Sequence, residues 1–167
     1  MTDFENLIRH LVEGGVDFIV IGGFAATIHG AARLTVDLDV AYSREPENIN
    51  RLAKSLVDLD PYLRGAPLGL PFQFDVATIS RGMNFTLTTS AGDLDLLGIV
   101  TGGGPYEALI SESDLVEIFG YRVRCLSLGK LIEVKRAAGR PKDFDAIAEL
   151  ESLAEEAENS HGGAEGH

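Results

Sequence analysis

The chain has 167 residues, of which 45% are hydrophobic and 24% charged, and its formal net charge is -12. These values are typical of one globular domain with a real core, and the acidic balance argues against broad non-specific binding to nucleic acid. No apolar run approaches the ~18 residues of a membrane-spanning helix, and the acidic start of the chain is unlike a secretory signal or a transit peptide. A cytoplasmic location, with no membrane partner, is therefore expected.

Hydrophobic periodicity predicts alternating helices and strands along the chain. In the first half it predicts a helix opened by the capping box Thr2-x-x-Glu5 and closed at Gly14-Gly15, a buried strand at 17–21, a short helix at 24–29, a strand at 37–42, and a helix from Pro46 to about Leu59. In the second half it predicts a proline-rich loop at 60–74, strands at 84–89 and 93–99, a hairpin at 115–126, and helices at 127–138 and from Pro141 onward.

These elements predict a single mixed domain of the α/β (α+β) class over residues 1–150, with a mixed β-sheet, flanking helices and two C-terminal helices. Residues 151–167 contain five Glu and no Lys or Arg. We expect them to hold the end of the last helix and an acidic, disordered tail. The single cysteine, Cys125, excludes an intramolecular disulfide, and its alternating surroundings predict a half-buried strand position.

Two carboxylates lie two residues apart in Asp37-Leu-Asp39. Residues i and i+2 of a strand point to the same face, so these side chains would project together. A hard divalent cation such as Mg²⁺ (or Mn²⁺) would compensate their charge, because it prefers oxygen ligands. Asp93-Leu-Asp95 repeats the pattern, and either of its carboxylates could complete the site. The alternative is that both pairs lie on a solvated strand face.

A double glycine precedes the first acidic pair. Gly22 and Gly23 lie between a predicted strand and a short helix, where backbone N–H groups and the helix dipole favour a phosphate. Without side chains, both residues let a bulky anion approach the backbone closely. Glycine turn, paired carboxylates and a later acidic strand together form a coherent set for nucleotide chemistry.

The same residues carry a resemblance to a known family. The order of an apolar strand, Gly-Gly, thirteen intervening residues and Asp-Leu-Asp-Val resembles the signature of the nucleotidyltransferase superfamily that includes DNA polymerase beta. The segment KLIEVKRAAGRPKDFDAIAEL, residues 130–150, resembles the C-terminal helices of minimal bacterial members, including toxin-like nucleotidyltransferases of toxin–antitoxin systems.

This resemblance implies a nucleotidyltransferase-like mixed sheet and a metal-dependent enzyme. Such an enzyme moves a nucleoside monophosphate from a nucleoside triphosphate, such as ATP, to an acceptor hydroxyl on an RNA end, a protein or a small molecule. The implied catalytic and metal-binding residues are Asp37, Asp39 and Asp95, with Gly22 and Gly23 holding the nucleotide's phosphates. An antitoxin is an implied protein partner.

One position departs from the family pattern. Many active members have Ser where this chain has Gly23, so a hydroxyl that could contact phosphate is missing. A catalytically degenerate nucleotide-binding or regulatory module of the same fold is therefore the alternative function.

Two basic residues are further candidates for nucleotide binding. Arg33 could contact a phosphate bidentately, or it could pair with Asp37 or a neighbouring carboxylate. The resemblance favours Lys135, in the locally basic late helices, as a phosphate contact over ordinary surface charge. We expect Asp143 to be a helix-start charge, and His29 to satisfy backbone carbonyls rather than bind a metal.

Overall fold

A computed structural model describes the backbone of residues 1–165 and the side chains of residues 1–159. The helices are α1 (Phe4–Glu13), α2 (Gly22–Ile28), α3 (Pro46–Leu56), α4 (Val76–Arg81), α5 (Tyr106–Leu109), α6 (Leu128–Ala138) and α7 (Phe144–Glu165). The strands are β1 (Phe18–Ile21), β2 (Asp37–Tyr42), β3 (Tyr62–Leu63), β4 (Asn84–Thr89), β5 (Gly92–Leu97), β6 (Ile99–Val100), β7 (Gly104–Pro105), β8 (Ser113–Ile118) and β9 (Tyr121–Leu126).

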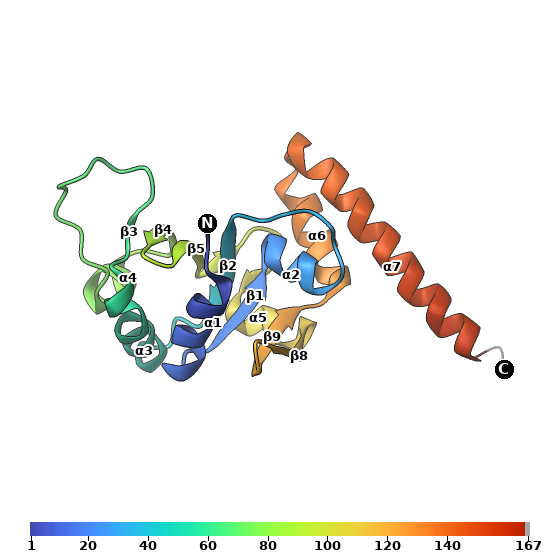
Figure 1. Cartoon of the computed structure of the whole chain (residues 1–167), viewed down its shortest axis with the longest axis horizontal. Helices are drawn as coiled ribbons and strands as arrows, with labels where there is room; N and C mark the ends of the chain where they lie inside the picture. The colour runs from blue at the N-terminus through green and yellow to red at the C-terminus, as the bar shows by residue number, and fades with distance from the viewer. Residues whose placement is uncertain (166–167) are drawn as a thin grey trace.

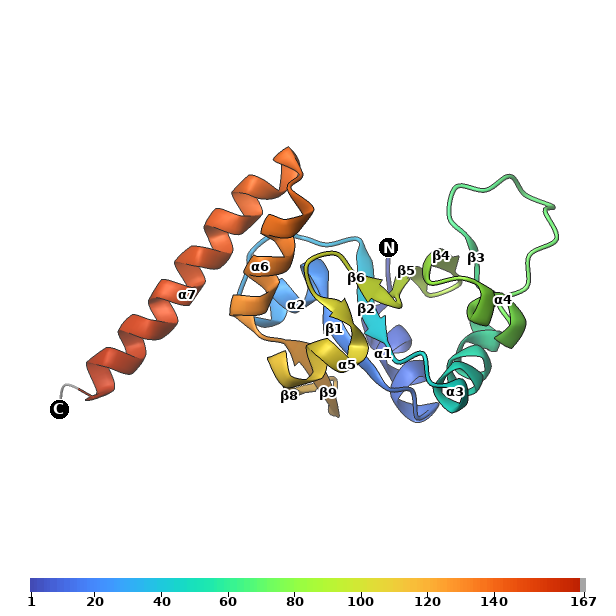
Figure 2. The ribbon, with the colours of Figure 1, turned by 180° about the vertical axis from the view of Figure 1, so that it is seen from behind.

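Seven strands form one mixed sheet in the order β3-β4-β5-β2-β1-β9-β8. The pairs β2–β5 and β1–β9 are parallel, and all other neighbours are antiparallel. Strands β6 and β7 form a separate two-stranded ribbon, which Figure 2 shows from behind beside α5. The predicted fold class is confirmed: a mixed sheet with flanking helices, followed by the two C-terminal helices α6 and α7.

The core follows from the apolar periodicity of the sequence. All four residues of β1 are buried, and α1 buries Leu7, Ile8 and Leu11 on one face. Helices α1 and α3 pack together, as do α6 and α7 at the other end of the molecule (Figure 1). Cys125 is fully buried in β9, deeper than the half-buried position that its alternating pattern predicted.

Two local predictions were wrong in detail. Asp3, not Thr2, caps α1, since its carboxylate accepts a hydrogen bond from the Asn6 N–H. Thr2 instead donates a hydrogen bond to the Val36 carbonyl and accepts one from the Asp93 N–H at 3.2 Å, which joins the start of the chain to β5. The predicted loop at 60–74 contains the short edge strand β3, because pairing with β4 outweighs its proline-rich composition.

The last helix is longer than the sequence pattern suggested. Its backbone is helical to Glu165, and its first half packs on α6 before the helix projects from the body (Figure 1). Residues 166 and 167 lie outside the described part of the chain, so the disordered tail stays a prediction there. Within the described residues, no helix is both long and apolar enough to cross a membrane.

Candidate metal and nucleotide site

The parallel pairing of β2 and β5 brings the two acidic motifs together. Its register sets Asp37 opposite Asp93 and Asp39 opposite Asp95. The intervening residues Leu38 and Leu94 point to the other face and are fully buried, as strand alternation requires.

Asp37, Asp39 and Asp95 each place one carboxylate oxygen within 4.8 Å of the others. All three side chains are partly buried, so the acidic pairs do not form a freely solvated strand face. Asp93, the other candidate for the third carboxylate, is outside this group. Its carboxylate lies beside Arg64, with 3.5 Å between Asp93 Oδ1 and Arg64 Nε, a neighbour that it shares with Asp95. The geometry therefore favours Asp95 over Asp93.

Repulsion and burial shape the electrostatics of this cluster. Burial, followed by the charges of Asp37 and Asp95, raises the pKa of Asp39 to about 8. Burial also raises the pKa of Asp95, against the opposing effect of the Arg64 guanidinium. Among the described residues, Asp39 Oδ1 is buried without a hydrogen-bond partner. An unpartnered oxygen among three carboxylates fits a hard divalent cation such as Mg²⁺ or Mn²⁺.

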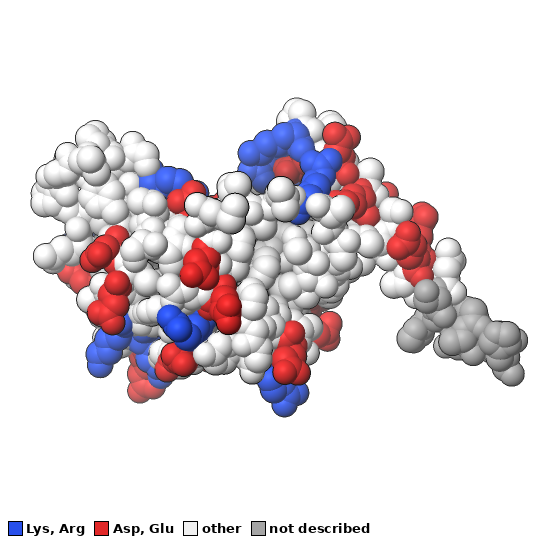
Figure 3. All heavy atoms as spheres, viewed as in Figure 1, with Lys and Arg blue, Asp and Glu red and all other residues white. Residues whose placement is uncertain are grey.

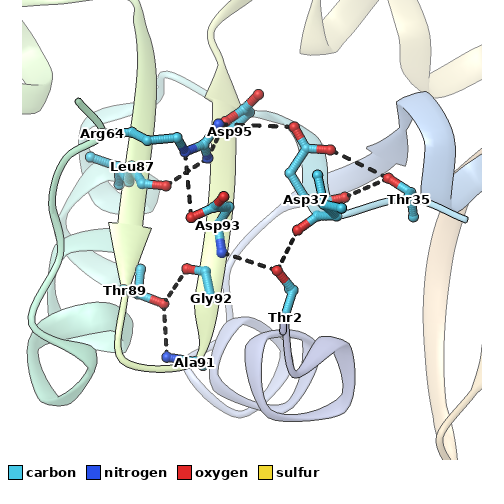
Figure 4. Close-up of polar contacts among 11 residues, drawn as sticks. Thr2, Thr35, Asp37, Arg64, Leu87, Thr89, Ala91, Gly92, Asp93 and Asp95 are labelled. Atoms are coloured by element: carbon cyan, nitrogen blue, oxygen red, sulfur yellow. Dashed lines mark hydrogen bonds and ion pairs between the residues drawn. The ribbon is translucent and has the colours of Figure 1, made fainter.

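Arg64 enters this acidic cluster from the end of β3 (Figure 4). Its guanidinium donates a hydrogen bond to Asp95 Oδ1 at 2.7 Å and lies 4.0 Å from Asp37 Oδ2. Nothing in the local sequence marks this residue, because Arg64 stands alone in a loop-like stretch. Its position depends on the pairing of the edge strands β3 and β4, for which the sequence carries no strong local signal.

Gly22 and Gly23 begin α2 and press closely against the acidic strand. Gly22 has φ +69°, and a Cβ there would lie 2.1 Å from Asp39 Oδ2. A Cβ on Gly23 would lie 2.8 Å from the hydroxyl oxygen of Thr35. That hydroxyl also donates to the Asp37 backbone carbonyl at 3.1 Å. Thr35 thus places a hydroxyl beside Gly23, a contact for which the local sequence carries no signal.

A cavity of about 450 Å³ opens beside the carboxylates. Gly22, Gly23, Asp39, Asp95 and Lys135 form its polar part, together with Arg140. Apolar side chains from β5, β6 and α6 line the remainder: Leu97, Val100, Leu131 and Val134. The cavity is therefore lined by both charged and apolar side chains. Figure 3 shows Lys and Arg gathered where α6 meets α7, above a hollow in the surface.

A buried carboxylate forms ion pairs with the two basic residues of this cavity. Asp143, only 6% exposed, lies 2.7 Å from Arg140 Nε and 3.8 Å from Lys135 Nζ, measured to its Oδ2 and Oδ1 respectively. Asp143 was expected to be only a helix-start charge; the structure instead places it between two cations. Sequence spacing could not show this, since the Gly139–Pro141 break separates α6 from α7.

Arg33 points toward α7 instead of Asp37. It lies 3.8 Å from an Asp145 oxygen and 3.9 Å from a Glu149 oxygen. It also lines a second cavity of about 190 Å³, which shares Gly23 and Lys135 with the first. His29 Nε2 lies 2.9 Å from the Leu126 carbonyl oxygen, the kind of backbone contact expected of it.

Comparison with known proteins places this fold. No protein-family model matches the chain, and no curated protein matches its sequence. Among solved structures, a candidate nucleotidyltransferase from Thermotoga maritima (TM1012) matches with a TM-score of 0.55 at 13% identity, covering 89% of this chain and 93% of that one. The antibiotic-resistance factor ANT(2'')-Ia matches with a TM-score of 0.56 at 15% identity, covering 98% and 94%. The chain thus has a nucleotidyltransferase-like fold, as its sequence motifs implied.

Proposed function

We propose that this protein is a metal-dependent nucleotidyltransferase. It would transfer a nucleoside monophosphate from a nucleoside triphosphate, such as ATP, to an acceptor hydroxyl. The observation that carries this proposal is the convergence of Asp37, Asp39 and Asp95 beside a cavity that also presents Gly22, Gly23 and Lys135. The nucleotidyltransferase-like fold supports it.

The residues of the site divide the chemistry among them. Asp37, Asp39 and Asp95 would hold Mg²⁺ or Mn²⁺, which when bound polarises phosphoryl oxygens and stabilises the entering and leaving oxygens. The bare backbone of Gly22 and Gly23 lets the triphosphate approach the carboxylates, and Lys135 with Arg140 offsets its negative charge.

Asp95 would accept the proton of the acceptor hydroxyl. The acceptor oxygen forms a bond to the α-phosphorus, the bond between that phosphorus and the bridging oxygen breaks, and pyrophosphate leaves. Positioning of the two reactants supplies much of the rate enhancement in such a displacement.

The acceptor is proposed to be a hydroxyl on a small molecule, a protein or an RNA end. Similarity to the antibiotic-resistance factor ANT(2'')-Ia supports a small molecule. The resemblance of residues 130–150 to toxin-like nucleotidyltransferases supports a toxin-type role with an antitoxin as partner. A label-transfer assay with each kind of acceptor tests these classes side by side.

The protein is incubated with each α-³²P-labelled nucleoside triphosphate, Mg²⁺ or Mn²⁺, and RNA, protein or small-molecule acceptors. We expect label transfer that falls by about a hundredfold or more in Asp39→Ala, the scale of losing one transition-state charge contact. Asp114→Ala is the matched control, because Asp114 is an exposed strand carboxylate that lies outside the triad.

The same experiment distinguishes the proposed enzyme from the alternative, a catalytically degenerate module of the same fold. Metal-dependent nucleotide binding without label transfer would favour the degenerate regulatory module, for which the side-chain-free Gly23 is the specific argument. Absence of both binding and transfer would contradict the nucleotide site altogether.

A further inference from the structure

Arg64 occupies an unusual place in the proposed metal site. Its guanidinium offsets the negative charge of three carboxylates. It donates a hydrogen bond to Asp95 Oδ1 at 2.7 Å and lies within ion-pair distance of Asp37 and Asp93. Figure 4 shows the side chain reaching across β4 to all three. A positive charge is therefore already bound to Asp95, whose carboxylate would have to face the ion when a metal binds.

Arg64 and a divalent ion compete for the same carboxylates. Asp95 belongs both to the Arg64 ion pair and to the group of three carboxylates able to share an ion. A guanidinium hydrogen bond takes up lone pairs on Asp95, and two cations close together repel each other. Full metal coordination by Asp95 thus requires Arg64 to loosen its hold.

The surroundings of Arg64 allow such a movement. It directly follows β3, a two-residue strand at the edge of the sheet, and begins the loop of residues 64–75, which projects from the body (Figure 1). Apart from the carboxylates, its side chain has one hydrogen-bond partner among the described residues, the Leu87 carbonyl at 2.7 Å. Within the described residues its Nε is buried without a hydrogen-bond partner.

We propose that Arg64 is an internal counter-cation of the metal-free protein, and that metal binding displaces its guanidinium from Asp95. This inference rests on the proposed metal-dependent function. Arg64 is then a positioning residue, because its guanidinium keeps Asp37, Asp93 and Asp95 close together before the metal binds. The energy needed to release it lowers the affinity of the site for the metal.

The first test measures Mn²⁺ binding by electron paramagnetic resonance, without nucleotide or acceptor. We expect Arg64→Gln to bind Mn²⁺ about tenfold more tightly than the natural chain, the scale of one charged hydrogen bond. Arg81→Gln is the matched control. Arg81 is an exposed arginine on α4 whose side chain makes no ion pair or hydrogen bond in the described part of the chain, so its loss should leave the affinity unchanged.

The outcomes distinguish this inference from the proposed function. Equal or weaker Mn²⁺ binding by Arg64→Gln would overturn the role of Arg64 while leaving the metal site in place. Absence of Mn²⁺ binding in both the natural chain and Arg64→Gln would overturn the metal site and the inference with it.

A second test uses the natural chain and so does not depend on the folding of a variant. Trypsin cleaves after an arginine only when that side chain can enter the specificity pocket of trypsin. The bond Arg64–Gly65 lies at the start of the projecting loop. We expect saturating Mn²⁺ to speed cleavage at Arg64 relative to Arg81–Gly82, as followed by mass spectrometry. Cleavage at Arg64 that is unchanged or slowed by Mn²⁺ would contradict the displacement.

Discussion

Asp39 is the carboxylate of the site whose charged form is disfavoured to the point that its pKa lies near neutral pH. It is partly buried next to Asp37 and Asp95, and these surroundings raise its pKa to about 8. Without a metal, Asp39 therefore keeps its proton at neutral pH, whereas metal coordination requires the charged form. Proton and metal compete for the same oxygen atoms.

This competition predicts how the stability of the metal-free protein depends on pH. The folded-state pKa of about 8 exceeds the ordinary Asp value of 3.8, so between these values the folded state holds a proton that the unfolded state has lost. The free energy of unfolding should then fall as pH rises from about 4 to about 8. Urea unfolding in EDTA at pH 5 and pH 8 measures this fall.

Asp39→Asn should reduce the loss of stability between pH 5 and pH 8, because Asn does not titrate. Asp114→Asn, on exposed β8, is the control and should behave as the natural chain does. An equal loss in Asp39→Asn and the natural chain would show that other groups govern the pH dependence.

At the scale of elements, the site depends on how closely α2 approaches β2. Gly22 follows β1 and begins α2 with a positive φ, and its Cα faces the Asp39 carboxylate without room for a methyl group. The glycine therefore serves both the turn and the packing against the metal ligand.

Gly22→Ala should cost more stability than a positive φ alone explains, and it should weaken Mn²⁺ binding by displacing Asp39. Gly120→Ala is the matched control, because Gly120 has φ +83° and nothing within 4 Å of an added Cβ. We expect about 1–2 kcal/mol for the left-handed conformation at either site and a further ~1–3 kcal/mol for crowding at Gly22. Urea unfolding and Mn²⁺ titration of both variants measure the difference, and equal effects would contradict the close approach.

At the scale of the whole molecule, α6 lines the cavity beside the carboxylates, and α7 packs against α6. Leu150 on α7 is 1% exposed, and Leu153 lies 3.5 Å from the position of a Cβ on Gly30, so the first half of α7 is anchored to the body. The second half projects away from it, as both views show (Figures 1 and 2). This anchoring sets α6, with Lys135, against the carboxylate strands.

Leu150→Ala should lower the free energy of unfolding by about 2–5 kcal/mol, the usual cost of emptying a buried leucine site. It should also weaken nucleotide binding, because the Asp143–Lys135 contact depends on how α7 packs on α6. Leu68→Ala, at a leucine 94% exposed in the projecting loop, should change neither quantity. Calorimetry and nucleotide titration check this, and unchanged nucleotide binding in Leu150→Ala would contradict a role for α7 in the site.

Much of this arrangement follows from the sequence alone. The alternation in Asp37-Leu-Asp39 and Asp93-Leu-Asp95 determines that each pair shares a strand face, and the apolar runs determine a mixed α/β core. Helix boundaries such as the Ser127 cap of α6 were also predictable, since capping is a local interaction.

Only the tertiary structure decided which of these residues meet. The β2–β5 register selected Asp95 over Asp93, edge pairing of β3 carried Arg64 into the acidic cluster, and docking of α7 placed Asp143 between Lys135 and Arg140. These contacts join segments far apart in the chain or separated by a turn. Their geometry depends on strand register and helix packing, which local sequence preferences do not encode, whereas strand alternation and helix caps depend only on neighbouring residues.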